Sequence, residues 1–221
     1  MSILSEERLS DSPYVEKVWR TVSYQPGNFT SIAVSHWEMV VTKYRGRIDI
    51  MVRGPETRAT IAPAPPDAEF FGIQFKMGTF LSKFPATGLV DSGILLPEAC
   101  SKTFWLDGAA WQFPTFENAD TFVTRLNRGG LLHQDNVVAD TLAGQVKDLS
   151  LRSVQRRFLR VTGLTHTVIE QINRARQAQA LLEQGVSILD TVDRAGYADQ
   201  PHLTRSLKRL IGQTPAQILK K

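Results

Sequence analysis

Two short basic segments in the last third of the chain constrain its fold more than any other feature. Residues 196–209, with the sequence GYADQPHLTRSLKR, begin with a turn at Gly196 and continue as a helix that Asp199 can cap. Residues 148–158, DLSLRSVQRRF, form a similar unit in which Ser150 is the capping residue. Between the two units, apolar residues recur at helical spacing and predict one long helix over residues 168–182.

Each basic helix is expected to have an apolar stripe on one side and long polar side chains on the other. Val154 and Phe158 belong to the stripe of the first helix, and Leu203 and Leu207 to that of the second. In a helix-turn-helix protein the second helix lies in the major groove of DNA, where Arg pairs with guanine and Gln with adenine. This pattern favours a protein that binds double-stranded DNA.

The outer faces of the two helices supply the candidate contact residues. Base contacts are predicted from Arg152, Gln155 and Arg156 in one major groove and from Gln200, His202 and Arg205 in the next. Phosphate contacts, which position DNA without reading its sequence, are predicted from Arg157, Arg160, Arg174, Lys208 and Arg209. The competing interpretation is that these are ordinary solvated helix faces. The joint occurrence of caps, turns and stripes in both units favours the DNA interpretation.

A series of motifs follows in a fixed order along the region from about residue 117 to residue 221. They are Leu149-Ser150-x-Arg152-x-Val154-Gln155-Arg156-x-Phe158, Thr162-Gly163, Arg174-Ala175, Leu181-Leu182, Ser187-Ile188-x-x-x-Val192, Gly196-Tyr197-x-Asp199-Gln200-x-His202-Leu203-x-Arg205-x-Leu207-Lys208 and Gly212-x-Thr214-Pro215. In this order they resemble the DNA-binding domain of the AraC/XylS family. The resemblance implies seven helices, with two helix-turn-helix units bridged by a long helix, and a sequence-specific transcription regulator.

The charge of the chain is divided unevenly between its two parts. Residues 147–221 hold 13 Lys and Arg against 6 Asp and Glu, whereas the first 146 residues hold 13 against 16. A basic C-terminal part on a slightly acidic N-terminal part is the asymmetry expected when only one part meets an anionic polymer.

The N-terminal half has the pattern of an antiparallel β domain. Residues 31–41 and 47–53 alternate apolar and polar side chains and are rich in β-branched residues, and Gly and Pro separate such segments. The pattern becomes helical near Pro114, where Thr115 is predicted to cap a helix. We therefore predict an α+β chain, with a barrel-like or sandwich-like β domain over residues 1–114 and an all-α DNA-binding domain over residues 115–221.

By its position, the β domain resembles the effector-binding or dimerising domain that family members place before the DNA reader. Its residues predict only an aromatic β domain. His36 and Trp37 are candidate contacts to a small-molecule effector, because the run His36-Trp37-Glu38 combines a hydrogen-bond donor, an aromatic ring and a carboxylate. Arg53 is a further candidate, at a strand end where it would neutralise an anionic effector, and the alternative is that it is an ordinary surface residue. The alternative is that most aromatic side chains of this domain belong to its core.

Other functional classes have weaker support in the sequence. Cys100 is the single cysteine, and the four histidines are scattered without metal-ligand spacing. The chain also has none of the glycine-rich phosphate loops or hydrolase motifs that mark common enzymes. We expect no catalytic residue, no metal site and no cofactor. The alternatives are an enzyme, or an interaction module that uses the basic helices on a partner other than DNA.

The expected setting follows from the cysteine count and from hydropathy. A lone cysteine forms no internal disulfide, and no apolar stretch has the length of a signal peptide or a membrane span, so we expect a cytoplasmic protein without membrane contact. RNA polymerase is a candidate partner, and a homodimer is compatible with the pattern but not required by it. The effector, the operator and the choice between activation and repression are left open.

Overall fold

Alternation of apolar and polar residues shapes the N-terminal half of the protein into strands. The computed structural model describes residues 3–100, 102–142, 144–145 and 150–220. The strands within this part of the chain are β1 (Ile3–Leu9), β2 (Val15–Ser23), β3 (Gly27–Ser31), β4 (Glu38–Tyr44), β5 (Arg47–Arg53), β6 (Thr60–Ala64), β7 (Ala68–Phe75), β8 (Thr79–Leu81), β9 (Gly93–Leu95), β10 (Glu98–Cys100), β11 (Thr103–Leu106), β12 (Ala109–Gln112) and β13 (Leu132–Gln134).

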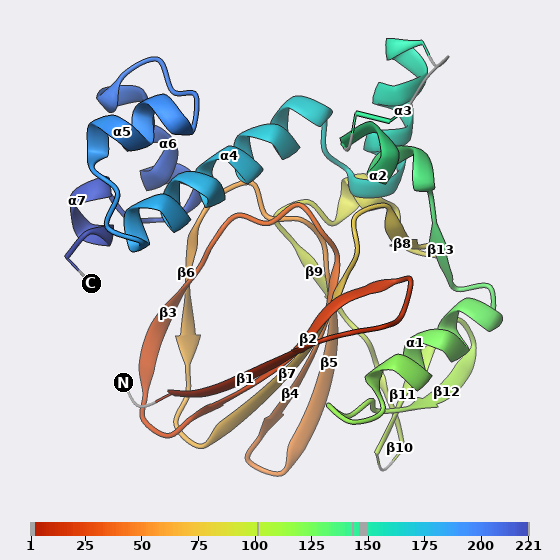
Figure 1. The fold of residues 1–221 in the computed structure, drawn as a ribbon. Coiled ribbons are helices and arrows are strands. Elements are labelled where there is room, and N and C mark those ends of the chain that lie inside the picture. Colours follow the sequence, from red (N-terminus) through yellow and green to blue (C-terminus); the bar gives the residue numbers. More distant parts are fainter. Residues whose placement is uncertain (1–2, 101, 143, 146–149, 221) are drawn as a thin grey trace. The chain divides into compact units, whose positions relative to one another are not determined.

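Six of these strands form one antiparallel sheet, in the order β1-β2-β7-β4-β5-β9 (Figure 1). Smaller sheets pair β10-β11-β12, β13-β8 and β3-β6. The antiparallel β-rich fold predicted for the N-terminal half is therefore confirmed.

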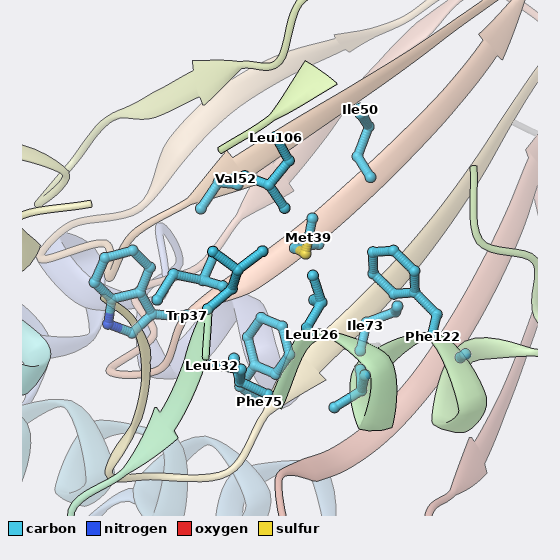
Figure 2. Packing of buried hydrophobic residues seen from close by; sticks show 14 of the residues in the cluster. Trp37, Met39, Ile50, Val52, Ile73, Phe75, Leu106, Phe122, Leu126 and Leu132 are labelled. Carbon is cyan, nitrogen blue, oxygen red and sulfur yellow. The ribbon is translucent and has the colours of Figure 1, made fainter. Parts of the chain in front are cut away.

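The core lies on one face of the large sheet. Val18, Ile73, Met39 and Val52 are neighbours in register across four strands, and all four are fully buried. Figure 2 shows side chains of this face packed with Phe122 and Leu126. A row of buried residues across neighbouring strands is the consequence of the two-residue period that the sequence displays.

The C-terminal part is helical, as predicted. The helices are α1 (Ala119–Arg128), α2 (Asn136–Leu142), α3 (Leu151–Thr162), α4 (His166–Glu183), α5 (Ile188–Arg194), α6 (Gln200–Leu210) and α7 (Pro215–Ile218), with a short 3-10 turn η1 (Ala86–Gly88) in the β-rich part. Seven α-helices within the described residues, with α4 as the longest, agree with the predicted domain.

The prediction that Thr115 caps the first of these helices was wrong. Asn118 is the residue that precedes the helix, and α1 begins at Ala119. Thr115 forms two reciprocal hydrogen bonds with Asn118, from its backbone amide to the Asn118 Oδ1 (2.8 Å) and from the Asn118 amide to its hydroxyl (3.3 Å). Thr115 and Asn118 thus close a turn before the helix starts, and Phe122, Val123 and Leu126 form the buried apolar face of α1.

The chain divides into two compact units, which do not follow the predicted division at residues 114 and 115. Unit 1 comprises Met1–Gly27, His36–Pro55 and Pro63–Leu164, and unit 2 comprises Asn28–Ser35, Glu56–Ala62 and Thr165–Lys221. Helices α1 to α3 thus belong with the large sheet, and α4 to α7 with segments around β3 and β6. The functional boundary after residue 114 stays a prediction.

None of the described helices combines the length and the apolar character that crossing a membrane requires.

Candidate nucleic-acid interface

The first candidate reading helix, α3, is defined at both ends by residues that the sequence singled out. The hydroxyl of Ser150 accepts a hydrogen bond from the Ser153 amide (3.2 Å), which satisfies an unpaired donor of the first turn. Gly163 ends the helix with a φ of 73°, and a Cβ atom there would lie 2.6 Å from the Ala86 carbonyl oxygen. Only glycine therefore fits this end of α3.

Helix α3 buries one face and exposes the other, as predicted. Phe158 and Val161 are fully buried, while Arg152, Gln155 and Arg156 are exposed. The helix contains no acidic residue. Its exposed side therefore offers guanidinium and amide donors without a negative charge on the same helix, which suits contact with DNA. Residues 146–149, just before the capping Ser150, lie outside the described residues.

Two of the predicted phosphate contacts of α3 are engaged within unit 1. Arg157 Nη1 lies 2.8 Å and Arg160 Nη2 lies 2.9 Å from Oδ2 of Asp135, a buried carboxylate just before α2. Sequence reasoning missed this role of Asp135. In the sequence Asp135 stands just before the short helix α2, and nothing in the local pattern indicates its partners.

The second candidate reading helix, α6, has the predicted cap and stripe. Oδ1 of Asp199 accepts from the His202 amide (2.6 Å), and Pro201 stands in the first turn, where its missing amide proton leaves no helical bond unmade. Leu203, Leu207 and Leu210 are buried. Four residues of the predicted DNA-contact set are exposed on this helix: Gln200, Arg205, Lys208 and Arg209.

His202 and Arg174 differ from the other predicted contacts because both pack against Tyr197. The half-buried His202 ring meets the Tyr197 ring edge to face at 5.1 Å. Arg174 lies 5.0 Å above the same ring and donates to the Gly196 carbonyl oxygen (3.3 Å). Tyr197 itself is buried, and its hydroxyl lies 3.0 Å from that of Ser206. These contacts support the turn before α6, and the predicted DNA roles of His202 and Arg174 stay predictions.

The three predicted effector contacts differ in their relation to the core, and their predicted role stays a prediction. Trp37 is a core residue, and its Nε1 donates to the Val161 carbonyl oxygen of α3 (2.9 Å). Arg53 stands opposite Glu38 on the neighbouring strand, on the sheet face away from the core. His36 precedes β4 and is half-buried. The side chain of Glu38 accepts a hydrogen bond from Trp19 Nε1 on that same outer face.

A cavity of about 200 Å³ lies in unit 1 at the far end of the core face, and none of the three lines it. Its buried part includes Val41 and Phe71, and Phe116 from the segment before α1 also contributes. Four exposed charged residues surround it in two pairs, Arg20 with Glu117 (3.5 Å) and Lys43 with Glu69 (3.3 Å).

Glu117, which lines this cavity, has a shifted pKa. Hydrogen bonds from its own backbone amide and from the Thr115 side chain lower the pKa of Glu117 below the usual value for a glutamate, and Arg20 and Lys43 act in the same direction. Its carboxylate is therefore ionised at neutral pH, and the four charges around the cavity balance.

Comparisons with known proteins find matches to part of this chain. A family model described as a helix-turn-helix domain matches residues 145–221. The HTH-type transcriptional regulator VirS of Mycobacterium tuberculosis, in strains CDC 1551/Oshkosh and H37Rv, is 36% identical over 87 residues. These residues are 39% of this chain and 25% of VirS, so the chain spans about a quarter of the length of the relatives that it matches.

Two crystal structures of ToxT from Vibrio cholerae align over the whole chain. One, bound to (E)-4-(8-methylnaphthalen-1-yl)but-3-enoic acid, gives a TM-score of 0.42 at 9% identity and covers 100% of this chain and 99% of that chain. The other gives 0.41 at 8% identity and covers 98% of that chain. Likenesses this weak carry no argument about function.

The geometry of α3 and α6, with the family match over them, defines the class of this region. Residues 145–221 are a helix-turn-helix domain. The domain is of the AraC type, as the motifs of this region predicted.

Proposed function

We propose that the protein is a sequence-specific, DNA-binding regulator of transcription that reads duplex DNA with α3 and α6. The observation that carries the proposal is the exposure of Arg152, Gln155 and Arg156 on one helix and of Gln200 and Arg205 on the other, each set opposite a buried apolar stripe. These are the side chains whose donors pair with guanine and adenine edges in the major groove. The match to helix-turn-helix regulators supports the same conclusion.

The remaining exposed cations of α6 complete the proposal. Lys208 and Arg209 are suited to phosphate contacts, which fix the position of the protein on DNA. Helix α3 has a neutral cap and no acidic residue in its first turn, so the positive end of its dipole also favours phosphate, whereas the Asp199 carboxylate already occupies that end of α6.

Binding to DNA across a salt series tests this function. The purified chain is titrated, by fluorescence anisotropy, against the DNA upstream of its own gene and against a scrambled duplex of equal length. We expect preference for the upstream fragment and a steep loss of affinity with salt, about 10³–10⁵-fold between 50 and 200 mM if six to ten phosphates are contacted. No binding at low salt would contradict the function and favour a partner other than DNA.

A matched pair of variants separates base reading from charge. Arg152→Ala should reduce the preference for the upstream fragment, because a good base contact contributes about 1–3 kcal/mol of discrimination. Arg47→Ala removes an equal charge from an exposed position on β5, outside the helix-turn-helix region. It should leave the preference unchanged.

We further propose that a small molecule with an apolar body and a charged head controls this activity from the cavity of unit 1. The buried Val41 and Phe71 fit the body. A negatively charged head fits Arg20 and Lys43, where it replaces the carboxylates of Glu117 and Glu69 that pair with them. Ligands of this kind should raise the melting temperature of the wild-type protein. Val22→Phe, which places a larger side chain at the cavity wall, should abolish that shift, and an equal shift in the variant would place the ligand elsewhere.

A further inference from the structure

We infer that Asp135 is a positioning residue for the first reading helix, which it fixes by holding Arg157 and Arg160 within unit 1 and away from DNA phosphates. The inference rests on the proposed function. It replaces the phosphate contacts that the sequence predicted for these two arginines with a role inside the protein.

Asp135 connects three elements through its side chain and backbone. Oδ2 accepts from Arg157 (2.8 Å) and Arg160 (2.9 Å) of α3, and Oδ1 accepts from the Val137 amide (3.1 Å) in the first turn of α2. The Asp135 amide donates to the Gly78 carbonyl oxygen (2.9 Å), next to β8. Asp135 therefore bonds to both α2 and α3 through its side chain, and its backbone bonds to the segment beside β8.

The Gly78 contact leaves no room for a side chain. Gly78 has a φ of 89°, and a Cβ atom there would lie 2.6 Å from the Asp135 carbonyl oxygen. Glycine is thus required by both conformation and space. This close approach of two backbone segments fixes the position of Asp135 relative to the sheet. The Asp135 carboxylate in turn fixes the position of α3.

Burial explains why the two arginines stay with Asp135. The Asp135 side chain is only 6% exposed, and removal of its partners would leave a buried carboxylate uncompensated, which is strongly unfavourable. The arginines themselves are 40% and 63% exposed, so without the carboxylate their long side chains could turn outward. Two cations would then be added to the DNA-facing surface of α3.

Asp135→Asn tests the inference, because asparagine keeps the size of the side chain and an acceptor for the Val137 amide but removes the charge. On scrambled duplex, the slope of log affinity against log salt should steepen by about 1 to 2, since each added phosphate contact contributes roughly 0.9. At the same time, the preference for the upstream fragment should fall by about tenfold or more, because α3 loses its fixed orientation and with it base contacts. In Asp135→Asn/Arg157→Gln/Arg160→Gln, the slope should return to that of the wild type.

Asp120→Asn is the matched control. Asp120 also pairs with an arginine of unit 1, Arg8 (2.8 Å), but it lies on α1. The control changes the net charge by the same amount and should leave the salt slope and the preference unchanged.

Arg157→Gln/Arg160→Gln gives a second test, which does not depend on the folding of the Asp135 variant. If Asp135 holds both arginines, their loss leaves the salt slope on scrambled duplex unchanged and lowers the preference for the upstream fragment. A slope reduced by about 1 to 2 would show that they contact phosphate in the wild type, and would overturn the inference.

The outcomes distinguish this inference from the proposed function. Wild-type binding together with an unchanged slope in Asp135→Asn overturns the inference alone. Absence of binding by the wild-type protein overturns the proposed function, and the inference with it.

Discussion

The two reading helices share a sequence pattern but are held by different structures. At the C-terminal end of α3, the Val161 carbonyl oxygen accepts from the indole of Trp37, a side chain of the sheet core. At the corresponding end of α6, the carbonyl oxygens of Arg209 and Leu210 accept from the backbone amides of Ala59 and Ala33 (2.8 and 2.7 Å). The last carbonyls of a helix lack partners within it, and here residues far earlier in the chain supply them in both units.

The difference lies in how each support is made. Helix α3 depends on the Trp37 side chain and on the ion pairs of the buried Asp135, whereas α6 depends on backbone segments beside β3 and β6. A substitution of Trp37 or Asp135 can therefore remove the support of α3 directly. Because backbone amides support α6, substitutions affect that support only through side-chain packing.

The largest expected effects come from the buried stripes. Phe158→Ala in unit 1 should cost about 3–5 kcal/mol of stability, and Leu207→Ala in unit 2 about 2–5 kcal/mol, because both side chains are fully buried. All four tryptophans lie in unit 1, so their fluorescence reports on that unit, while circular dichroism reports on the helices of both. We expect Phe158→Ala to shift the fluorescence transition and Leu207→Ala to shift mainly the dichroism. Equal shifts of both signals in each variant would show that the units unfold as one.

Local patterns of the sequence predicted most of the elements that present the candidate contacts. Ser150 and Asp199 cap their helices, and Gly163 ends α3, because capping and left-handed geometry depend on residues within a few positions. The alternation of Ile48, Ile50 and Val52 likewise predicted the buried face of β5.

Contacts between residues far apart in the chain could not be predicted in the same way. Trp37 and Val161 are separated by 124 residues, and Asp135 and Arg160 by 25. Trp37 was interpreted as a ligand contact because it is a large aromatic residue between His36 and Glu38, a pattern that does not show which sheet face it occupies. The division of the helices between the two units also depends on such contacts, and composition alone favoured a boundary at residue 114.

Removal of the Trp37 donor should have the next largest effect. Trp37→Phe keeps an aromatic ring in the core but leaves the Val161 carbonyl without its partner, which should cost about 1–3 kcal/mol in chemical denaturation. Base discrimination by α3 should also weaken. Trp111→Phe is the matched control, because Trp111 Nε1 donates to another backbone carbonyl of unit 1, that of Leu106 (3.2 Å). If the control weakens DNA discrimination as much as Trp37→Phe, the indole of Trp37 has no particular role in holding α3.

A smaller effect is expected in unit 2 from the hydroxyl of Tyr197. Tyr197→Phe removes the bond to Ser206 on α6 and should reduce stability by about 0.5–1.5 kcal/mol. Ser206→Ala should give a similar loss, and the double variant should lose little more than either single variant, because the two changes remove the same bond. Additive losses would indicate that the hydroxyls do not act as a pair.

The smallest effect concerns pH. Because the folded protein lowers the pKa of Glu117, this residue contributes stability above its unfolded pKa near 4.5 and loses the contribution as the pH falls through the lower folded value. Glu117→Gln should therefore melt slightly below the wild type at pH 7, and the difference should disappear at strongly acidic pH. A difference that grows on acidification would contradict this sign.

The central claim, that two helices in two units each read their own bases, is tested most directly by the base preferences of two variants. Wild type, Arg152→Ala and Arg205→Ala are each selected against a randomised operator library, and the preferred base at every position is compared. We expect each variant to lose preference at its own base pairs, in two sets that do not overlap. Uniform weakening of all sequences, or loss at the same base pairs in both variants, would contradict the account.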